Sequence, residues 1–170
     1  MDKTNKEIKN LIIITGFSSQ GKSYISAELK KRFKYYVIHT DEFYQGKRKE
    51  LGMKVGEPDE HKTKLLKEYR PHATETTIVE GSHIGNKKEL DIFIKELDFN
   101  GNIYSFIVES PNIEKQFKSK HKERSDINWI GIRKWFGTVY DLDNIAKIEV
   151  VDDLVKFLQL DNEGIIHLSR

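Results

Sequence analysis

Gly16-Phe17-Ser18-Ser19-Gln20-Gly21-Lys22-Ser23 is a stretch with the Walker A spacing of Gly, four residues and Gly-Lys-Ser, which is typical of a phosphate-binding loop. In such a loop the glycines let the backbone wrap around phosphate, while successive amides and the N-terminus of the following helix supply a positive field. Lys22 adds a mobile cation for the β- and γ-phosphates, and Ser23 offers a hydroxyl to Mg²⁺. The stretch, together with Tyr24 after it, therefore predicts a nucleotide-binding loop.

The sequence on both sides of this stretch supports the same interpretation. The run from Leu11 to Ile14 is continuously apolar, as expected for a parallel strand that is buried on both faces. After the loop, Ile25, Leu29 and Phe33 recur at every fourth position and form one stripe of an amphipathic helix. The alternative is a glycine-rich turn that leads into a helix by chance. The flanking pattern favours a strand, a phosphate loop and a helix.

Length and composition indicate one domain over residues 1–170. A chain of 170 residues can bury about 70% of its unfolded surface without covalent cross-links. It has no cysteine, which excludes disulfides, thiolate metal sites and a cysteine nucleophile. The apolar run near the N-terminus is too short for a signal-peptide core or a membrane span, so we expect a soluble cytoplasmic protein with no membrane partner. The net charge of +2 does not by itself indicate nucleic-acid binding.

Two further strand signals end on carboxylates. Residues 35–40 are rich in aromatic and β-branched residues and lead into Asp41, and residues 76–79 lead into Glu80. The carboxyl ends of parallel strands lie at the edge of the sheet that also carries the phosphate loop. Asp41 is therefore a candidate to act on the hydroxyl or phosphate opposite ATP, and Glu80 to hold Mg²⁺ through water or to orient the reacting group. The alternative role of Asp41 is that of a helix N-cap or turn residue.

The acceptor side is expected in the region of about residues 44–70. Tyr44 begins it, and the basic, glycine-containing residues 45–56 precede a helix that starts near Pro58. His83 is a further candidate contact to the substrate, although a lone histidine in such a loop is more often structural or exposed. The lysines of this region fit a solvated face equally well.

A helical lid is predicted at about residues 119–137. Ser110-Pro111 is a helix start, and the helix after it becomes basic toward Arg124. A second helix is predicted at 127–140, so Arg124 and Arg133 flank a helix-turn-helix. Lid arginines suit phosphoryl transfer because a guanidinium can reach several oxygens of the transferring group. The alternative is a basic, solvated helix end whose charges favour the helix dipole.

The remaining chain completes an alternating α/β pattern. Strands are predicted at 103–108 and 145–151, and a helix at 86–97 precedes the first of them. Asp152-Asp153 is predicted to cap a last helix. Leu154, Phe157 and Leu158 are expected to face inward. Residues 161–170 are expected to add a short terminal strand or a docked tail.

With these residues placed, the chain resembles the P-loop kinases of small metabolites and nucleic-acid ends: uridine kinase, nicotinamide riboside kinase, gluconate and shikimate kinases, and polynucleotide 5′-hydroxyl kinase. The resemblance spans nearly the whole chain. The phosphate loop carries it, together with residues 39–44, which look like the Asp-x-Phe-Tyr of uridine kinases, and the acidic strand end at 78–81. It implies a three-layer α/β/α fold with a five-stranded parallel sheet in the order 2-3-1-4-5. In those families the carboxylate matching Asp41 is the general base, and lid arginines serve the transferring phosphoryl group.

Three functions follow as hypotheses. The first is an ATP- and Mg²⁺-dependent kinase that phosphorylates a nucleoside, nucleotide or related small metabolite. The second is a kinase of nucleic acid, at a 5′-hydroxyl end or a modified base, in which the basic residues 47–54 and 115–124 follow the phosphates. The third is an ATPase switch without an acceptor. A GTPase is rejected because Asp98-Phe99-Asn100-Gly101 precedes a strand and no Asn-Lys-x-Asp motif follows it.

Overall fold

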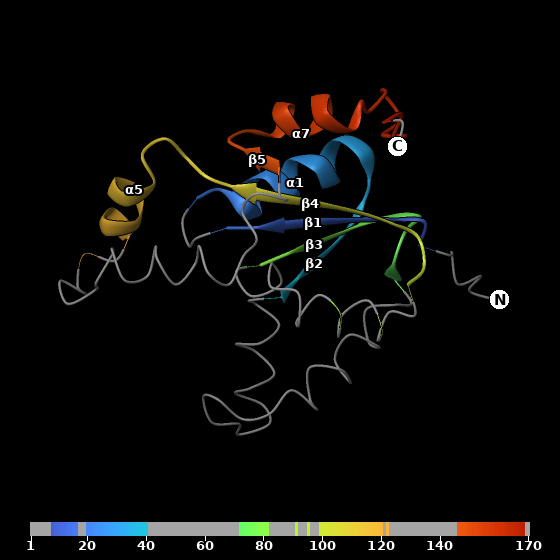
Figure 1. Ribbon diagram of the computed structural model, residues 1–170, viewed down its shortest axis with the longest axis horizontal. Coiled ribbons are helices and arrows are strands. Elements are labelled where there is room, and N and C mark those ends of the chain that lie inside the picture. The colour runs from blue at the N-terminus through green and yellow to red at the C-terminus, as the bar shows by residue number, and fades with distance from the viewer. Residues whose placement is uncertain are drawn as a thin grey trace, which may run out of the picture.

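A computed structural model describes residues 8–16, 20–40, 72–81, 99–120 and 146–168, together with three single residues, Asp91, Lys95 and Lys122. Within them five parallel strands form one sheet (Figure 1). They are β1 (Asn10–Thr15), β2 (Tyr36–His39), β3 (Thr76–Glu80), β4 (Asn102–Val108) and β5 (Ala146–Ile148). Their order, β2-β3-β1-β4-β5, confirms the order implied by the family resemblance.

Strand β1 lies at the centre of the sheet because its side chains are apolar on both faces. It pairs with β3 on one side and β4 on the other, so that Ile12 lies between Ile78 and Tyr104. The four residues from Leu11 to Ile14 are at most 1% exposed. This burial explains the continuous apolar run in the sequence, which a strand with one solvated face would not show.

The alternating side chains of β1 face two separate cores. Ile12 and Ile14 pack in the core that also contains residues of α1 (Lys22–Phe33) and α7 (Val151–Leu158). Leu11 and Ile13 pack in the opposite core, which closes against Phe99. Figure 1 shows α1 and α7 lying together over one face of the sheet. In the described residues the longest helix, α1, has 12 residues, and none is long and apolar enough to cross a membrane.

The junction between β5 and α7 differs from the prediction. The fifth strand ends at Ile148 and does not continue to residue 151, because Val151 is already the first residue of α7. The N-cap of this helix is Val150, and neither of the two aspartates occupies that position. Asp153 acts from inside the first turn, where its Oδ2 accepts hydrogen bonds from the amides of Glu149 (2.9 Å) and Val150 (3.0 Å). The carboxylate thus reaches back from the third helical position.

Two other helix predictions also need correction. The helix after β4, α5 (Ile113–Lys120), begins two residues after Pro111, because the Ser110 hydroxyl first accepts the amide of Asn112 (3.2 Å) in a turn. Phe117 in this helix is buried. In α7, Leu154 and Leu158 are buried, whereas Phe157 is 47% exposed and touches Phe106 only edge-on.

The C-terminal residues form a docked tail. Among the described residues they contribute one antiparallel bridge, between Leu160 and Ile166, and no terminal strand. The Tyr35 hydroxyl donates a buried hydrogen bond to the Gly164 carbonyl. The tail is therefore held against the core that contains α1 and α7.

Replacing Asp153 by alanine is expected to lower the free energy of unfolding by about 1 kcal/mol at neutral pH, since it removes the acceptor of two amides at a helix start. These hydrogen bonds hold the pKa of Asp153 below its ordinary value of 3.8. The stabilisation is therefore present above that value and is lost as the pH falls through the folded-state pKa. Urea unfolding between pH 7 and pH 2 measures both effects.

Asp152→Ala is the matched control, because this neighbour pairs with Arg32 (2.9 Å) across the surface between α7 and α1. We expect a smaller loss of stability, as is usual for exposed ion pairs. An equal loss in the two variants would show that Asp153 acts only through its charge near the helix dipole.

Candidate active site

The ends of the predicted phosphate loop are formed by glycines in conformations that other residues avoid. Gly16 follows β1 with φ 143°, and Gly21 is the N-cap of α1 with φ 98°. Such positive φ angles favour glycine because it has no Cβ. Of the predicted loop, Phe17, Ser18 and Ser19 lie outside the described residues. The predicted change from strand to loop to helix is confirmed at both ends.

Lys22 and Ser23 are the first two residues of α1, where the helix N-terminus carries a positive field. Lys22 is only 6% exposed, and its carbonyl accepts a hydrogen bond from the Ser26 hydroxyl (2.8 Å). Tyr24, the next residue, is 68% exposed. The first turn of α1 therefore presents a buried lysine, a hydroxyl and a surface ring beside the loop.

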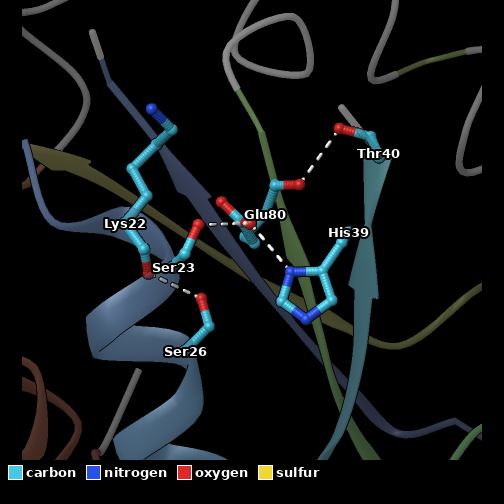
Figure 2. Close-up of polar contacts among 6 residues, drawn as sticks. All are labelled: Lys22, Ser23, Ser26, His39, Thr40 and Glu80. Carbon is cyan, nitrogen blue, oxygen red and sulfur yellow. Dashed lines mark hydrogen bonds and ion pairs between the residues drawn. The ribbon is translucent and has the colours of Figure 1, made fainter. Parts of the chain in front are cut away.

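Glu80, at the end of β3, connects this turn to the sheet. It is 4% exposed, and its Oε1 accepts a hydrogen bond from the Ser23 hydroxyl (3.0 Å). The same oxygen is 2.8 Å from Nδ1 of His39, which ends β2 (Figure 2). One carboxylate oxygen thus joins α1, β2 and β3 at the carboxyl edge of the sheet.

The register of the parallel strands produces this contact. His39 pairs with Glu80 across β2 and β3, which brings their side chains to the same level at the edge. The Thr40 hydroxyl then donates to the Glu80 carbonyl (3.0 Å), as Figure 2 shows. Asp41 follows Thr40 directly in the sequence and lies outside the described residues.

The carboxylate of Glu80 is stabilised as an anion. Burial raises the pKa of Glu80, whereas hydrogen bonds from His39 and Ser23 and the positive charge of Lys22 lower it, and the net pKa lies below its ordinary value. An ionised carboxylate accepts hydrogen bonds only, so Nδ1 of His39 carries the proton and donates it. At neutral pH the site therefore holds one buried negative charge beside the phosphate loop.

The second oxygen of Glu80 differs from the first in its hydrogen bonding. Oε2 is buried and has no hydrogen-bond partner within the described part of the chain, and the same holds for Oγ1 of Thr15 at the end of the adjacent β1. Buried polar atoms nearly always have partners. The carboxylate of Glu80 beside the hydroxyl of Ser23 suits Mg²⁺, which proteins bind through one or two carboxylates together with phosphates. Ser23 and Glu80 fit such an ion.

A cavity of about 710 Å³ opens at the same edge of the sheet. It is lined by residues 109–111 after β4 and by the β5–α7 junction, with Lys147 and Asp153. Gln20 links this cavity to the phosphate loop, since its Oε1 accepts the amide of Ser110 (3.3 Å). In open α/β sheets, ligands bind in crevices beyond the carboxyl ends of the strands. The cavity has the volume of a small-molecule site.

Solved structures with a similar fold include kinases and a resistance protein. The tunicamycin resistance protein of Deinococcus radiodurans matches with a TM-score of 0.64 at 16% sequence identity, over 90% of this chain and 97% of that protein. A sugar kinase of Janibacter sp. HTCC2649 matches with a TM-score of 0.56 at 14% identity, over 94% and 99%. Shikimate kinase of Aquifex aeolicus matches with 0.51 at 20% identity, over 88% and 96%.

The chain has the fold of the P-loop kinases. At 14% to 20% identity, these three likenesses establish the fold alone. No protein-family model and no curated protein matches the sequence.

The P-loop kinase fold brings together some of the predicted site residues. Lys22, Ser23 and Glu80 meet at one edge, as the sequence predicts for Glu80. The other predicted residues of the acceptor side and the lid lie outside the described residues: Asp41, Tyr44, His83, Arg124 and Arg133.

His39 is a residue of this site that is missing from the predicted set. The signal was present, because His39 ends one strand as Glu80 ends another, and strand ends of a parallel sheet meet at one edge.

Proposed function

We propose that the chain is an ATP- and Mg²⁺-dependent kinase that transfers the γ-phosphoryl group to a hydroxyl, or a phosphate, of a nucleoside, nucleotide or related small metabolite. The hydrogen bond between Ser23 and Glu80 carries this proposal. It places a hydroxyl and a buried carboxylate, both oxygen ligands, next to the end of a phosphate loop. The structural likeness to a sugar kinase and a shikimate kinase supports the same reaction class.

The donor side of the proposed site uses the phosphate loop and the neighbouring cavity. The backbone of residues 16–23 holds the phosphates, and Lys22 neutralises charge on the β- and γ-phosphates. The cavity after β4 and β5 takes the nucleoside part of ATP, because Gln20 joins it to the loop. Tyr24 is exposed on the first turn of α1, beside the loop, and contacts the nucleotide.

Ser23 and Oε2 of Glu80 hold Mg²⁺ directly or through water. The ion, when bound, withdraws charge from the β- and γ-phosphates. The protein keeps Glu80 ionised for this role through hydrogen bonds and through Lys22.

The acceptor side completes the transfer. The acceptor oxygen forms a bond to the γ-phosphorus while the bond between that phosphorus and the β–γ bridging oxygen breaks, and ADP leaves. Asp41 takes the proton of the acceptor hydroxyl, and Tyr44 and His83 line the acceptor pocket. Arg124 and Arg133 stabilise the charge on the transferring group. Closure of the region at 119–137 excludes water from the γ-phosphate.

The test is a transfer experiment with γ-labelled ATP and Mg²⁺. The protein is incubated with pooled nucleosides, nucleotides, sugars and oligonucleotides, and the labelled product is identified. Tunicamycin belongs in the pool because one of the matching structures is a resistance protein named for it. Lys22→Met is the control for contaminating kinases. Label that reaches only water, whatever acceptor is added, would instead indicate an ATPase switch.

Asp41→Asn is expected to lower turnover of the identified acceptor by about 100-fold, since it removes the proposed general base. The affinity for ATP should stay close to that of the wild type, because the phosphate loop is unchanged. Steady-state kinetics with the identified acceptor and calorimetric titration with ATP separate these quantities. Unchanged turnover would leave Asp41 as a turn or capping residue.

A nucleic-acid acceptor is the second candidate, favoured by the basic surface of α5. Its exposed lysines are Lys115, Lys118 and Lys120, and Lys122 follows them. Figure 1 shows α5 beyond the carboxyl ends of the strands. Oligonucleotide binding that weakens steeply with salt would support this candidate, because phosphate contacts release counterions.

A further inference from the structure

We propose that His39 is a positioning residue for Glu80: its Nδ1–H holds Oε1 and thereby leaves Oε2 as the oxygen that meets Mg²⁺ or its water. The inference rests on the proposed function, because the ion belongs to the bound ATP. It assigns different tasks to the two oxygens of one carboxylate.

Two donors from different elements converge on Oε1. The Ser23 hydroxyl approaches from α1 at 3.0 Å, and Nδ1 of His39 approaches from β2 at 2.8 Å. Figure 2 shows the other carboxylate oxygen pointing away from His39. Rotation of the carboxylate would break both hydrogen bonds. The two bonds therefore determine which oxygen has no donor from Ser23 or His39. That oxygen, Oε2, is buried and has no partner among the described residues.

His39 is better suited to this task than Ser23. Ser23 is itself a proposed ligand of the ion, so its hydroxyl has to orient toward two partners. His39 is not a proposed ligand of the ion. Its position is set by the backbone, because His39 is in register with Glu80 across β2 and β3, and the hydroxyl of the next residue, Thr40, donates a hydrogen bond to the Glu80 carbonyl. Groups that hydrogen-bond a metal-binding carboxylate typically change metal affinity or activity by 10–100-fold when removed.

Burial makes the hydrogen bond from His39 important for the charge of Glu80. The Glu80 side chain is 6% exposed, whereas the His39 side chain is 32% exposed. A buried carboxylate needs hydrogen bonds to remain charged. The imidazole supplies one of them.

Three variants separate these effects. His39→Leu replaces the imidazole by an apolar side chain of moderate size and so removes the hydrogen-bond donor. His39→Asn places an amide N–H at the position of Nδ1, one bond from Cγ, and so restores the donor on a smaller side chain. His167→Leu is the matched control: it removes another contact between a histidine and a carboxylate, Nε2 to Oδ2 of Asp161 at 2.8 Å, in the C-terminal tail.

The experiment measures Mn²⁺ binding to each protein with a non-hydrolysable ATP analogue, from the loss of the free-ion EPR signal. His39→Leu is expected to raise the Mn²⁺ dissociation constant about tenfold, and His39→Asn to return it to within about threefold of the wild type. His167→Leu should bind Mn²⁺ like the wild type. Affinity for the analogue in EDTA, measured by calorimetry, should be equal in all four proteins, and thermal unfolding checks that each is folded.

Two results would overturn the inference. Wild-type Mn²⁺ affinity in His39→Leu would show that the hydrogen bond does not orient Glu80. Equal losses in His39→Leu and His39→Asn would show that the imidazole acts by its volume and not by its donor. The wild-type titrations test the proposed function separately: an analogue that does not bind rejects nucleotide binding, whereas a wild type that binds the analogue but takes up no Mn²⁺ rejects the metal site and the inference about His39 and leaves nucleotide binding in place.

Discussion

The Glu80→Gln protein is expected to fold normally and to transfer phosphate about 1000-fold more slowly than the wild type, because it loses the charge of the proposed metal ligand. Glutamine has the shape of glutamate, and its carbonyl can still accept the hydrogen bonds of Ser23 and His39. The amide nitrogen takes the place of Oε2, and it is a donor that repels a cation. Steady-state kinetics at saturating ATP, over a range of Mg²⁺ concentrations, measure the loss.

Glu75→Gln is the matched control for this experiment. Glu75 precedes β3 at its other end, pairs with Lys9 on the surface at 3.1 Å and lies far along the strand from the site. We expect wild-type kinetics from this protein. Wild-type kinetics in Glu80→Gln as well would remove Glu80 from the reaction and leave it as a structural carboxylate.

The same variant provides a pH test of the buried charge. The pKa of Glu80 is lower in the folded protein than its ordinary value of 4.5, so its ionisation stabilises the fold above that value. This contribution is lost as the pH falls through the folded-state pKa. The free energy of unfolding of the wild type, relative to Glu80→Gln, should therefore decrease on acidification below about pH 4.5. A difference that is constant over this range would contradict the lowered pKa.

The Gly16→Ala protein is expected to lose about 4 kcal/mol of its free energy of unfolding, a large part of the 5–15 kcal/mol typical of a domain. Two effects add here. The φ angle of 143° is unfavourable for alanine. A Cβ on Gly16 would also lie 2.6 Å from the carbonyl oxygen of Val108, at the end of β4. That backbone is paired with β1 and β5 and has little freedom to move.

Gly21→Ala separates the two effects. Gly21 also has a positive φ angle, 98°, but a Cβ there would meet no atom within 4 Å. We expect a loss of only about 1–2 kcal/mol, due to backbone strain alone. Urea unfolding curves with equal slopes compare the two variants. A loss in Gly21→Ala that matches that in Gly16→Ala would show that contact with β4 contributes nothing.

Local sequence patterns predicted the elements around the phosphate loop well, because each is determined by neighbouring residues. An apolar run, two glycines and an apolar residue at every fourth position are sufficient to predict β1, the loop and α1. The same patterns failed at the start of α7. Valine is a poor N-cap by its own chemistry, and it takes this position because Asp153 reaches back to the preceding amides.

Phe157 shows a second limit of periodicity. Its spacing from Leu154 and Leu158 predicts that it faces the core. In the structure these two leucines are buried, whereas the Phe157 ring is half-exposed and contacts Phe106 edge-on. The width of the buried stripe depends on what the helix covers. That is a property of the neighbouring elements and not of the helical sequence.

The sequence by itself determined that this chain has a phosphate loop between a buried strand and a helix, and that an acidic residue ends another strand. Only the tertiary structure decided that Ser23, His39 and Glu80 share one oxygen atom. His39 and Glu80 are 41 residues apart in the chain, and Ser23 and Glu80 are 57 apart. Their meeting depends on the register of parallel strands, which forms through hydrogen bonds between distant backbones and leaves no local pattern in the sequence.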